Sequence, residues 1–173
     1  DLREESAKFI NSLPFGGMAI GGAFEKSANG SFDVLRWTIP HLAEGRPRHF
    51  LGIGQIADIF ESVELGIDTF YCVIPTREAR HGGIYTRQGR NDIARQQYEN
   101  DQSKLDQDCL CPVCQTLTRA ELHSQFKNKN PKAGENATIH NVYFFNNLMT
   151  KIRKAIKNNR LPELKKEYAS KTN

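Results

Sequence analysis

Long apolar runs are missing from this sequence, and cysteine, methionine and tryptophan are scarce. The 173 residues include four Cys, two Met and one Trp, and no apolar run approaches 18 residues. A helix that spans a bilayer needs about 20 predominantly apolar residues, so the sequence predicts no membrane protein. Four cysteines are also too few for a small secreted domain held together by disulfides, which excludes that class.

The apolar content of the sequence is high enough for the chain to fold around a core. Apolar residues make up 38% of the sequence, which argues against wholesale disorder. The length predicts one domain with a sizeable core. Nothing points to an oxidising compartment, so we expect a cytoplasmic location. Because the chain begins Asp1-Leu2-Arg3 without Met, we expect it to be part of something longer.

The formal charge of +4 is concentrated at one end of the chain. Residues 151–173 hold eight Lys or Arg against two Glu, a net charge of +6, which leaves −2 for the preceding 150 residues. Such a basic segment could attract an RNA backbone. It could equally be an ordinary solvated helix face.

Helical and extended patterns alternate in the first half. Apolar spacing predicts helices, and short apolar runs predict strands. The expected order is helix 2–13, strand 18–20, helix 32–42, strand 49–53, helix 56–63 and strand 69–74. This alternation is typical of parallel strands joined by crossover helices. We therefore predict an α/β fold.

Three such units are too few to close a barrel and would leave sheet edges uncovered. Either a further part of the protein supplies more sheet, or the chain is a small doubly wound fold. Gly21-Gly22 and Gly52 follow the first two strands, where α/β proteins bind ligands. The alternative is that these glycines only turn the chain. Cys72 is expected to be a small buried residue of the third strand.

The second half of the sequence does not continue the alternation of helices and strands. Residues 87–108 are polar and predict an exposed excursion, residues 116–126 predict a helix, and residues 127–137 predict a loop. A long amphipathic helix is then expected from Val142 to Ile156, with lysines on its outer face.

Three cysteines lie within six residues, at Cys109, Cys111 and Cys114. Tetrahedral Zn²⁺ takes four nitrogen or sulfur ligands, and closely spaced cysteines can supply three of them from one turn. His123 and His140 are the candidates for the fourth ligand. We favour His140, because His123 falls inside the helix after the cluster, where a histidine more often packs. The alternative is three unrelated cysteines. A closed Cys3His site is structural rather than catalytic.

Several ordered blocks carry a family resemblance. They are LREESAKF at 2–9, AIGG at 19–22, RPRHFLGIG at 46–54, FYCVIPTREARHGGIYT at 70–86, DCLCPVCQTLTRAELH at 108–123 and TIHNVYFFNNLM at 138–149. In this order they resemble the C-terminal half of tRNA-guanine transglycosylases, also called queuine tRNA-ribosyltransferases. The resemblance covers nearly the whole chain.

The resemblance implies the C-terminal part of a (β/α)8 TIM-type barrel, at residues 1–86, followed by a structural zinc-binding subdomain with a C-terminal helix and basic tail, at residues 87–173. The family exchanges the wobble guanine of tRNA for a 7-deazaguanine base, such as queuine or its precursor, through a covalent enzyme–RNA intermediate. Implied partners are tRNA, the base, and a second subunit in a homodimer or a heterodimer with a related chain.

The resemblance also implies roles for individual residues. The base pocket corresponds to Gly21, Gly22, Leu51 and Gly52, and the zinc ligands correspond to Cys109, Cys111, Cys114 and His140. RNA contacts correspond to Gly52, Ile53, Gly54, Gln55, Ile56, Ala57, Asp58, Thr76, Arg77, Glu78, Ala79 and Arg80. Arginine guanidinium groups suit phosphate or splayed bases. Without the resemblance, Arg77 and Arg80 could be solvated loop charges.

Two departures from the family pattern concern the chemistry. The family's catalytic nucleophile is an aspartate that attacks ribose C1′, and Tyr71 occupies that position here. A phenol is a poorer nucleophile than a carboxylate near pH 7. Asp68 should point to the opposite side of the strand and so cannot replace it. The second departure is the base-pocket loop, residues 23–27, which differs from the family sequence.

These observations predict a fragment or a diverged member of the family. Because Tyr71 replaces the aspartate, we expect that this chain does not run the usual covalent mechanism. The alternative is a non-catalytic, zinc-stabilised tRNA-binding chain or partner subunit of such an enzyme.

Overall fold

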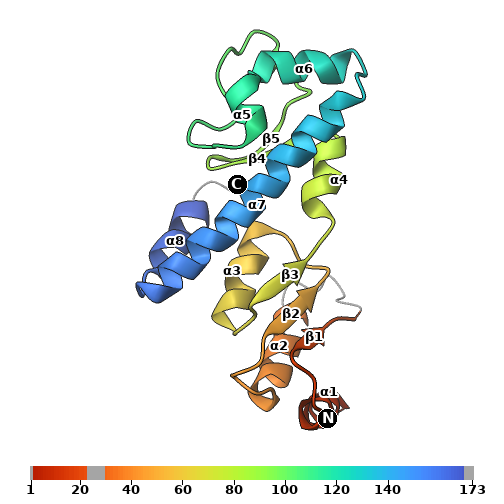
Figure 1. Ribbon diagram of the computed structural model, residues 1–173, viewed down its shortest axis with the longest axis vertical. Coiled ribbons are helices and arrows are strands. Elements are labelled where there is room, and N and C mark those ends of the chain that lie inside the picture. Colours follow the sequence, from red (N-terminus) through yellow and green to blue (C-terminus); the bar gives the residue numbers. More distant parts are fainter. Residues whose placement is uncertain (1, 23–29, 170–173) are drawn as a thin grey trace. The chain divides into compact units, whose positions relative to one another are not determined.

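Three short parallel strands and the helices between them make up the first of two units of the chain. The computed structural model describes residues 2–22 and 30–169, and the units are Asp1–Val73 and Ile74–Asn173 (Figure 1). The first unit contains α1 (Leu2–Ser12), β1 (Met18–Ile20), α2 (Gly30–Thr38), the 3₁₀ turn η1 (Ile39–His41), β2 (Arg48–Leu51), α3 (Ile56–Glu64) and β3 (Thr69–Tyr71). The strand order is β1-β2-β3, all parallel, which confirms the predicted alternation.

Only one face of this sheet is covered by its own unit. Met18, Ile20 and Phe50 point into a core that α1 and α2 complete with Ala7 and Leu35. Alternate strand residues point to opposite faces. The other face therefore carries the remaining side chains of the strands, and most of these are exposed or half-buried.

The third strand is shorter and more exposed than predicted. Strand β3 ends at Tyr71, and Ile74 already begins helix α4, with Pro75 in its first turn, where proline is well tolerated. Cys72 is half-buried, so the expectation of a buried cysteine inside this strand was wrong. The physical reason is the position of β3 at the sheet edge, with β2 as its only neighbour among the described residues.

The second unit is built around one long helix. It contains α4 (Ile74–Arg80), β4 (Gly83–Thr86), β5 (Gly89–Asp92), the 3₁₀ turn η2 (Gln96–Tyr98), α5 (Pro112–Thr116), α6 (Arg119–Lys127), α7 (Lys132–Lys157) and α8 (Leu161–Ala169). Strands β4 and β5 form an antiparallel hairpin. Helix α7 packs against α4, β4, α5, α6 and α8, and Figure 1 shows the hairpin and α4 lying along it.

Two predictions for this half were wrong. The segment 87–108 is not simply an exposed excursion, because β5 pairs with β4 and its sparse apolar residues Ile93, Tyr98 and Leu105 are buried. Residues 132–137 are helical rather than a loop, since α7 begins at Lys132. The alanines of this stretch pack into the core, which overrides the loop-like composition.

The structure does not test two of the sequence predictions. The base-pocket loop, residues 23–27, lies outside the described residues. The division of the complete protein into a barrel part ending at residue 86 and a zinc-binding subdomain beginning at residue 87 stays a prediction. Among the residues described, no helix combines the length and the apolar character needed to cross a membrane.

Candidate metal centre and open sheet face

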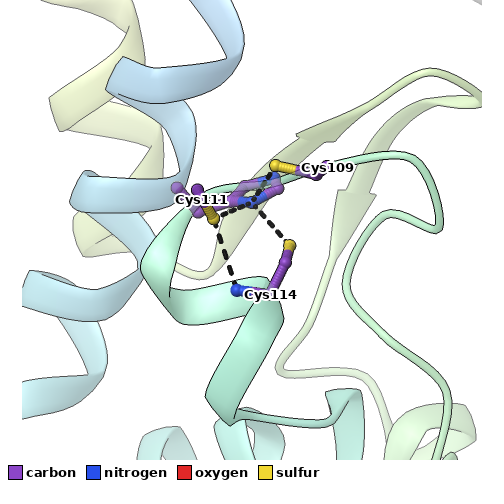
Figure 2. Close-up of side chains that lie close together, drawn as sticks. Cys109, Cys111 and Cys114 are labelled. Carbon is purple, nitrogen blue, oxygen red and sulfur yellow. Dashed lines mark hydrogen bonds between the residues drawn. The ribbon is translucent and has the colours of Figure 1, made fainter.

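The structure brings Cys109, Cys111, Cys114 and His140 into one buried group. Their ligand atoms all lie within 4.8 Å of one another. Nδ1 of His140 is 3.8 Å from the sulfur of Cys109, 3.5 Å from that of Cys111 and 3.3 Å from that of Cys114. Figure 2 shows the three cysteine side chains converging.

Local structure explains why these four atoms meet. Cys109 lies in the segment before α5, Cys111 caps the N-terminus of that helix, and Cys114 is in its middle. Pro112 occupies the first turn, where its missing N–H costs nothing. His140 lies inside α7, not before a helix as predicted, and its Nδ1 faces the three sulfurs.

This donor set fits tetrahedral Zn²⁺. Bond lengths of about 2.3 Å to sulfur and 2.0–2.1 Å to nitrogen in a tetrahedron place nitrogen and sulfur about 3.5 Å apart. The three observed separations bracket that value. Four protein ligands also fill the coordination shell, which is the arrangement of structural rather than catalytic zinc.

Hydrogen bonds orient the ligands from outside. Nε2 of His140 lies 2.8 Å from the carbonyl oxygen of Tyr85, so this nitrogen donates and Nδ1 is left as the metal-facing atom. The backbone N–H of Cys114 donates to the sulfur of Cys111 at 3.3 Å. Such donors favour a thiolate, the form of cysteine that binds metal.

Titration in the cluster follows from the same contacts. Hydrogen bonds with Cys109 and Cys114 hold the pKa of the Cys111 thiol well below its usual range, while the neighbouring sulfurs raise the pKa of Cys114. Burial lowers the pKa of His140, but hydrogen bonds to Cys109 and Cys111 outweigh it and raise the pKa to about 10.

His123 has the packing role expected of it. It is buried, and its Nδ1 lies 2.8 Å from the carbonyl oxygen of Ile93. It is not a member of the metal-ligand group.

The exposed face of the first unit's sheet gathers the residues predicted to form a base pocket. Leu51 is paired in register with Tyr71, whose side chain is 63% exposed. A Cβ on Gly21 would lie 3.0 Å from Cδ1 of Leu51, so this glycine is in close contact with the leucine. Gly52 donates its N–H to the carbonyl of Tyr71 at 2.8 Å. Gly22 is exposed and has a φ of 126°, which favours glycine.

The segments predicted to contact RNA are only partly exposed. In residues 52–58, Gly54 and Ile56 are buried, whereas Gln55 and Ala57 are exposed. Burial and the neighbouring Glu61 raise the pKa of Asp58.

In α4, Arg77 and Arg80 are exposed, while Ala79 faces the core. Glu78 forms an ion pair with Arg90 of β5, at 2.6 Å. Thr76 is half-buried. Arg77 and Arg80 are thus the most exposed side chains of α4.

Two features escaped the sequence reasoning. His49 and Thr69 lie on the exposed sheet face in register, with Nδ1 of the histidine 2.8 Å from Oγ1 of the threonine. Strand alternation could have placed them beside Leu51 and Tyr71. The second feature is Asn141, which is fully buried and hydrogen-bonded to segments distant in sequence.

Asp68, set aside as a nucleophile, has a structural partner. Its Oδ2 accepts the backbone N–H of Arg48 at 2.8 Å. This carboxylate helps to join β2 to the start of β3.

The sequence matches known proteins along its whole length. The family model described as queuine tRNA-ribosyltransferase matches residues 1–173. The queuine tRNA-ribosyltransferase of Protochlamydia amoebophila is 42% identical over 156 residues, which cover 90% of this chain and 40% of that protein. The enzymes of that name from Clostridium kluyveri and Halothermothrix orenii are 39% and 40% identical, and the matches cover 100% and 99% of this chain.

The chain spans less than half the length of these relatives, 46% in the last two cases. The match of the family model to every residue, together with these identities, establishes that the chain belongs to the queuine tRNA-ribosyltransferase family.

Proposed function

We propose that this chain is the C-terminal part of a tRNA-modifying protein of the transglycosylase type, whose substrates are tRNA and a 7-deazaguanine base such as queuine or its precursor. The observation that carries the proposal is the exposed sheet face, where Gly21, Leu51 and Tyr71 meet at the carboxyl ends of parallel strands. This end of an α/β sheet is where such folds bind ligands.

The complete protein would be a (β/α)8 barrel. In support, β1 and β3 each have an outer edge without a paired strand among the described residues. A parallel sheet is normally covered on both faces, and here one face is open. Further strands and helices, as in the longer relatives, would cover the edges and enclose the face.

Tyr71 decides whether such a protein is catalytic. In the family reaction a carboxylate attacks ribose C1′, the bond from C1′ to guanine breaks, and the incoming base later displaces the enzyme from the same carbon. A carboxylate forms and releases such a glycosyl ester readily. We propose that this chain, with a phenol at that place, does not run the usual covalent mechanism.

The second candidate function is a non-catalytic, zinc-stabilised partner subunit that positions tRNA for an active one. Tyr71 is the specific observation in its favour. Exposed apolar side chains in the second unit offer a contact surface for another subunit, since Leu110 between two of the cysteines is 72% exposed and Ile139 and Val142 of α7 are also exposed. Either function, acting on tRNA, places the protein in the cytoplasm.

The two candidates differ in one experiment. The chain is produced as Tyr71 and as Tyr71→Asp, each joined to the N-terminal half of the Clostridium kluyveri relative, and incorporation of labelled guanine into tRNA is measured. Exchange only in Tyr71→Asp supports a silenced enzyme. Exchange with Tyr71 itself refutes the proposed loss of the mechanism, and exchange in neither supports the partner subunit.

A matched control tests whether the position of the carboxylate matters. Val73 is also exposed and lies two residues beyond Tyr71. Val73→Asp should give no exchange, because its carboxylate lies beyond the end of β3.

We further propose that the Cys3His group holds one structural Zn²⁺ per chain. The support is the burial of all four residues and the convergence of their ligand atoms to within 4.8 Å of one another. When bound, the ion would supply folding energy to the second unit and no catalytic chemistry, because four protein ligands leave no open position.

A further inference from the structure

Asn141 joins three segments of the second unit from a completely buried position. It directly follows His140 in α7, and its side chain has 0% exposure. Its Oδ1 accepts the backbone N–H of Tyr85 at 3.0 Å, and its Nδ2 donates to the carbonyl oxygens of Pro75 at 3.0 Å and Gly83 at 2.8 Å. Both donor hydrogens and the acceptor oxygen of the amide are therefore used.

The backbone of Tyr85 is held at both of its polar atoms by consecutive residues of α7. His140 donates to its carbonyl oxygen at 2.8 Å, and Asn141 accepts from its N–H at 3.0 Å. The histidine also faces the three cysteine sulfurs. Through these two side chains, the metal group, strand β4 and helix α7 form one connected network.

The bond to Pro75 extends this network to α4. Pro75 lies in the first turn of that helix, and Ala79 packs into the core with 0% exposure. Gly134 of α7 faces α4, because a Cβ there would make an ordinary van der Waals contact of 3.7 Å with the Cα of Arg80. The inward side of α4 is thus fixed, and Arg77 and Arg80 remain exposed.

We propose that Asn141 is a positioning residue that couples the metal group to α4 and thereby holds Arg77 and Arg80 in place for the phosphate backbone of RNA. The inference rests on the proposed role of residues 76–80 in RNA binding. Arginine suits this task because its planar guanidinium can bind two phosphate oxygens at once, which rewards a fixed helix position.

The informative substitution is Asn141→Asp. It preserves the shape of the side chain and its acceptor for Tyr85, but it turns the donor facing two carbonyl oxygens into an acceptor. A buried polar group that loses its partner is costly, so α4 should detach locally. The four metal ligands keep their side chains. Asn146→Asp is the matched control, because Asn146 is exposed on the same helix and bonds only to a carbonyl of that helix.

The first measurement needs no RNA. Hydrogen–deuterium exchange in the 173-residue chain, loaded with zinc, should be about tenfold or more faster at the amides of residues 77–80 in Asn141→Asp. Amides of residues 111–114 and the zinc content should not change, and Asn146→Asp should match the parent. Unchanged exchange in α4 of a folded Asn141→Asp protein would overturn the proposal.

The second measurement separates positioning from general stability. An RNA hairpin with the sequence of a tRNA anticodon arm is titrated by fluorescence anisotropy. Asn141→Asp should weaken binding about tenfold in the parent background and hardly at all in a chain that already carries Arg77→Ala and Arg80→Ala. The same loss in both backgrounds indicates a merely structural role and also overturns the proposal.

A neutral variant separates the loss of the hydrogen bonds from the effects of added charge and misfolding. Asn141→Ser removes the reach to Pro75 without adding negative charge, and it carries both measurements if Asn141→Asp fails to fold. If the arginine substitutions leave RNA affinity unchanged, the proposed RNA-binding role of α4 fails. The exchange measurement then still decides whether Asn141 positions α4.

Discussion

The carbonyl oxygen of Tyr85 accepts a hydrogen bond from Nε2 of His140, 2.8 Å away, on the side of the ring opposite the cysteine sulfurs. This bond selects the tautomer whose Nδ1 can bind metal. It also makes the hairpin part of the site, since Tyr85 lies in β4. Loss of the metal should therefore loosen the packing of β4 against α7 as well as the arrangement of the cysteines.

Zinc binding gives the first prediction. Cys111→Ser should reduce zinc content from one ion per chain to none, because its buried sulfur is one of the four ligands proposed for the ion. The midpoint of thermal unfolding should fall, since structural zinc contributes directly to folding. Elemental analysis and circular dichroism check both expectations. Cys72→Ser, which changes a cysteine outside the group, should keep its metal, and a Cys111→Ser protein that still binds one zinc would refute the assignment.

The sequence allowed the parallel sheet and the ligand set to be predicted because both depend on local patterns. Apolar spacing predicted the helices of the first unit, although α2 ends at Thr38 and the predicted residues beyond it form the 3₁₀ turn that contains Pro40. The cysteine spacing predicted three members of the buried group, and His140 was chosen as the fourth because a histidine within the helix after the cluster more often packs. His123 indeed packs.

Other features depend on partners that no local pattern reveals. Asn141 binds Pro75 and Gly83, 66 and 58 residues away, so its role needs the tertiary structure. The start of α7 was missed because Gly134 and the neighbouring asparagines are typical of loops, whereas packing of Ala133 and Ala137 favours the helix. Exposure of Tyr71 could not be predicted, because it follows from the uncovered sheet face on which Tyr71 and Leu51 both lie.

Docking of the C-terminal helix gives the second prediction. Tyr168 of α8 is buried against Phe144, with ring centroids 6.4 Å apart. Tyr168→Ala should therefore destabilise the docked helix by about 3 kcal/mol. Limited proteolysis after Arg160 should become faster in this variant.

Tyr168→Phe is the control for this prediction, because it keeps the ring and should leave most of the docking intact. Arg87 adds a polar connection, since its guanidinium binds Glu167 of α8 and, at 3.1 Å, Asp108. If proteolysis is equally fast in the alanine and phenylalanine variants, packing of the ring is not what holds α8.

The pH dependence of stability gives the third prediction. The carboxylate of Asp101 accepts hydrogen bonds from the Ser103 hydroxyl and backbone N–H and from Arg119, and these hold its pKa below the usual range. A carboxyl group whose pKa is lower in the native state stabilises the fold above its unfolded-state pKa of about 3.9, and this contribution disappears as the pH falls through the native value.

Asp101→Asn should accordingly lower the free energy of unfolding by about 1 kcal/mol at pH 7. The difference between the two proteins should stay constant down to about pH 5 and shrink below pH 4. Urea denaturation at several pH values checks this. Acid-induced metal release affects both proteins and cancels in the difference. A difference that grows on acidification would show that the charge of Asp101 is not stabilising.

The turn between α3 and β3 gives the fourth prediction, which concerns the first unit alone. Gly66 has a φ of 101°, and a Cβ there would lie 2.8 Å from Nη1 of the buried Arg48. Gly66→Ala should lower the free energy of unfolding by about 1–2 kcal/mol from the backbone conformation alone, with the clash adding to it.

Gly45→Ala is the matched control for that turn, because nothing lies within 4 Å of its Cβ position and its φ is not positive. An alanine there restricts the unfolded chain and should leave stability unchanged or raise it by about 0.4–1 kcal/mol. The fluorescence of Trp37, the single tryptophan of the chain, follows unfolding of this unit in urea. Equal effects of the two substitutions would mean that the left-handed conformation of Gly66 does not determine how α3 leads into β3.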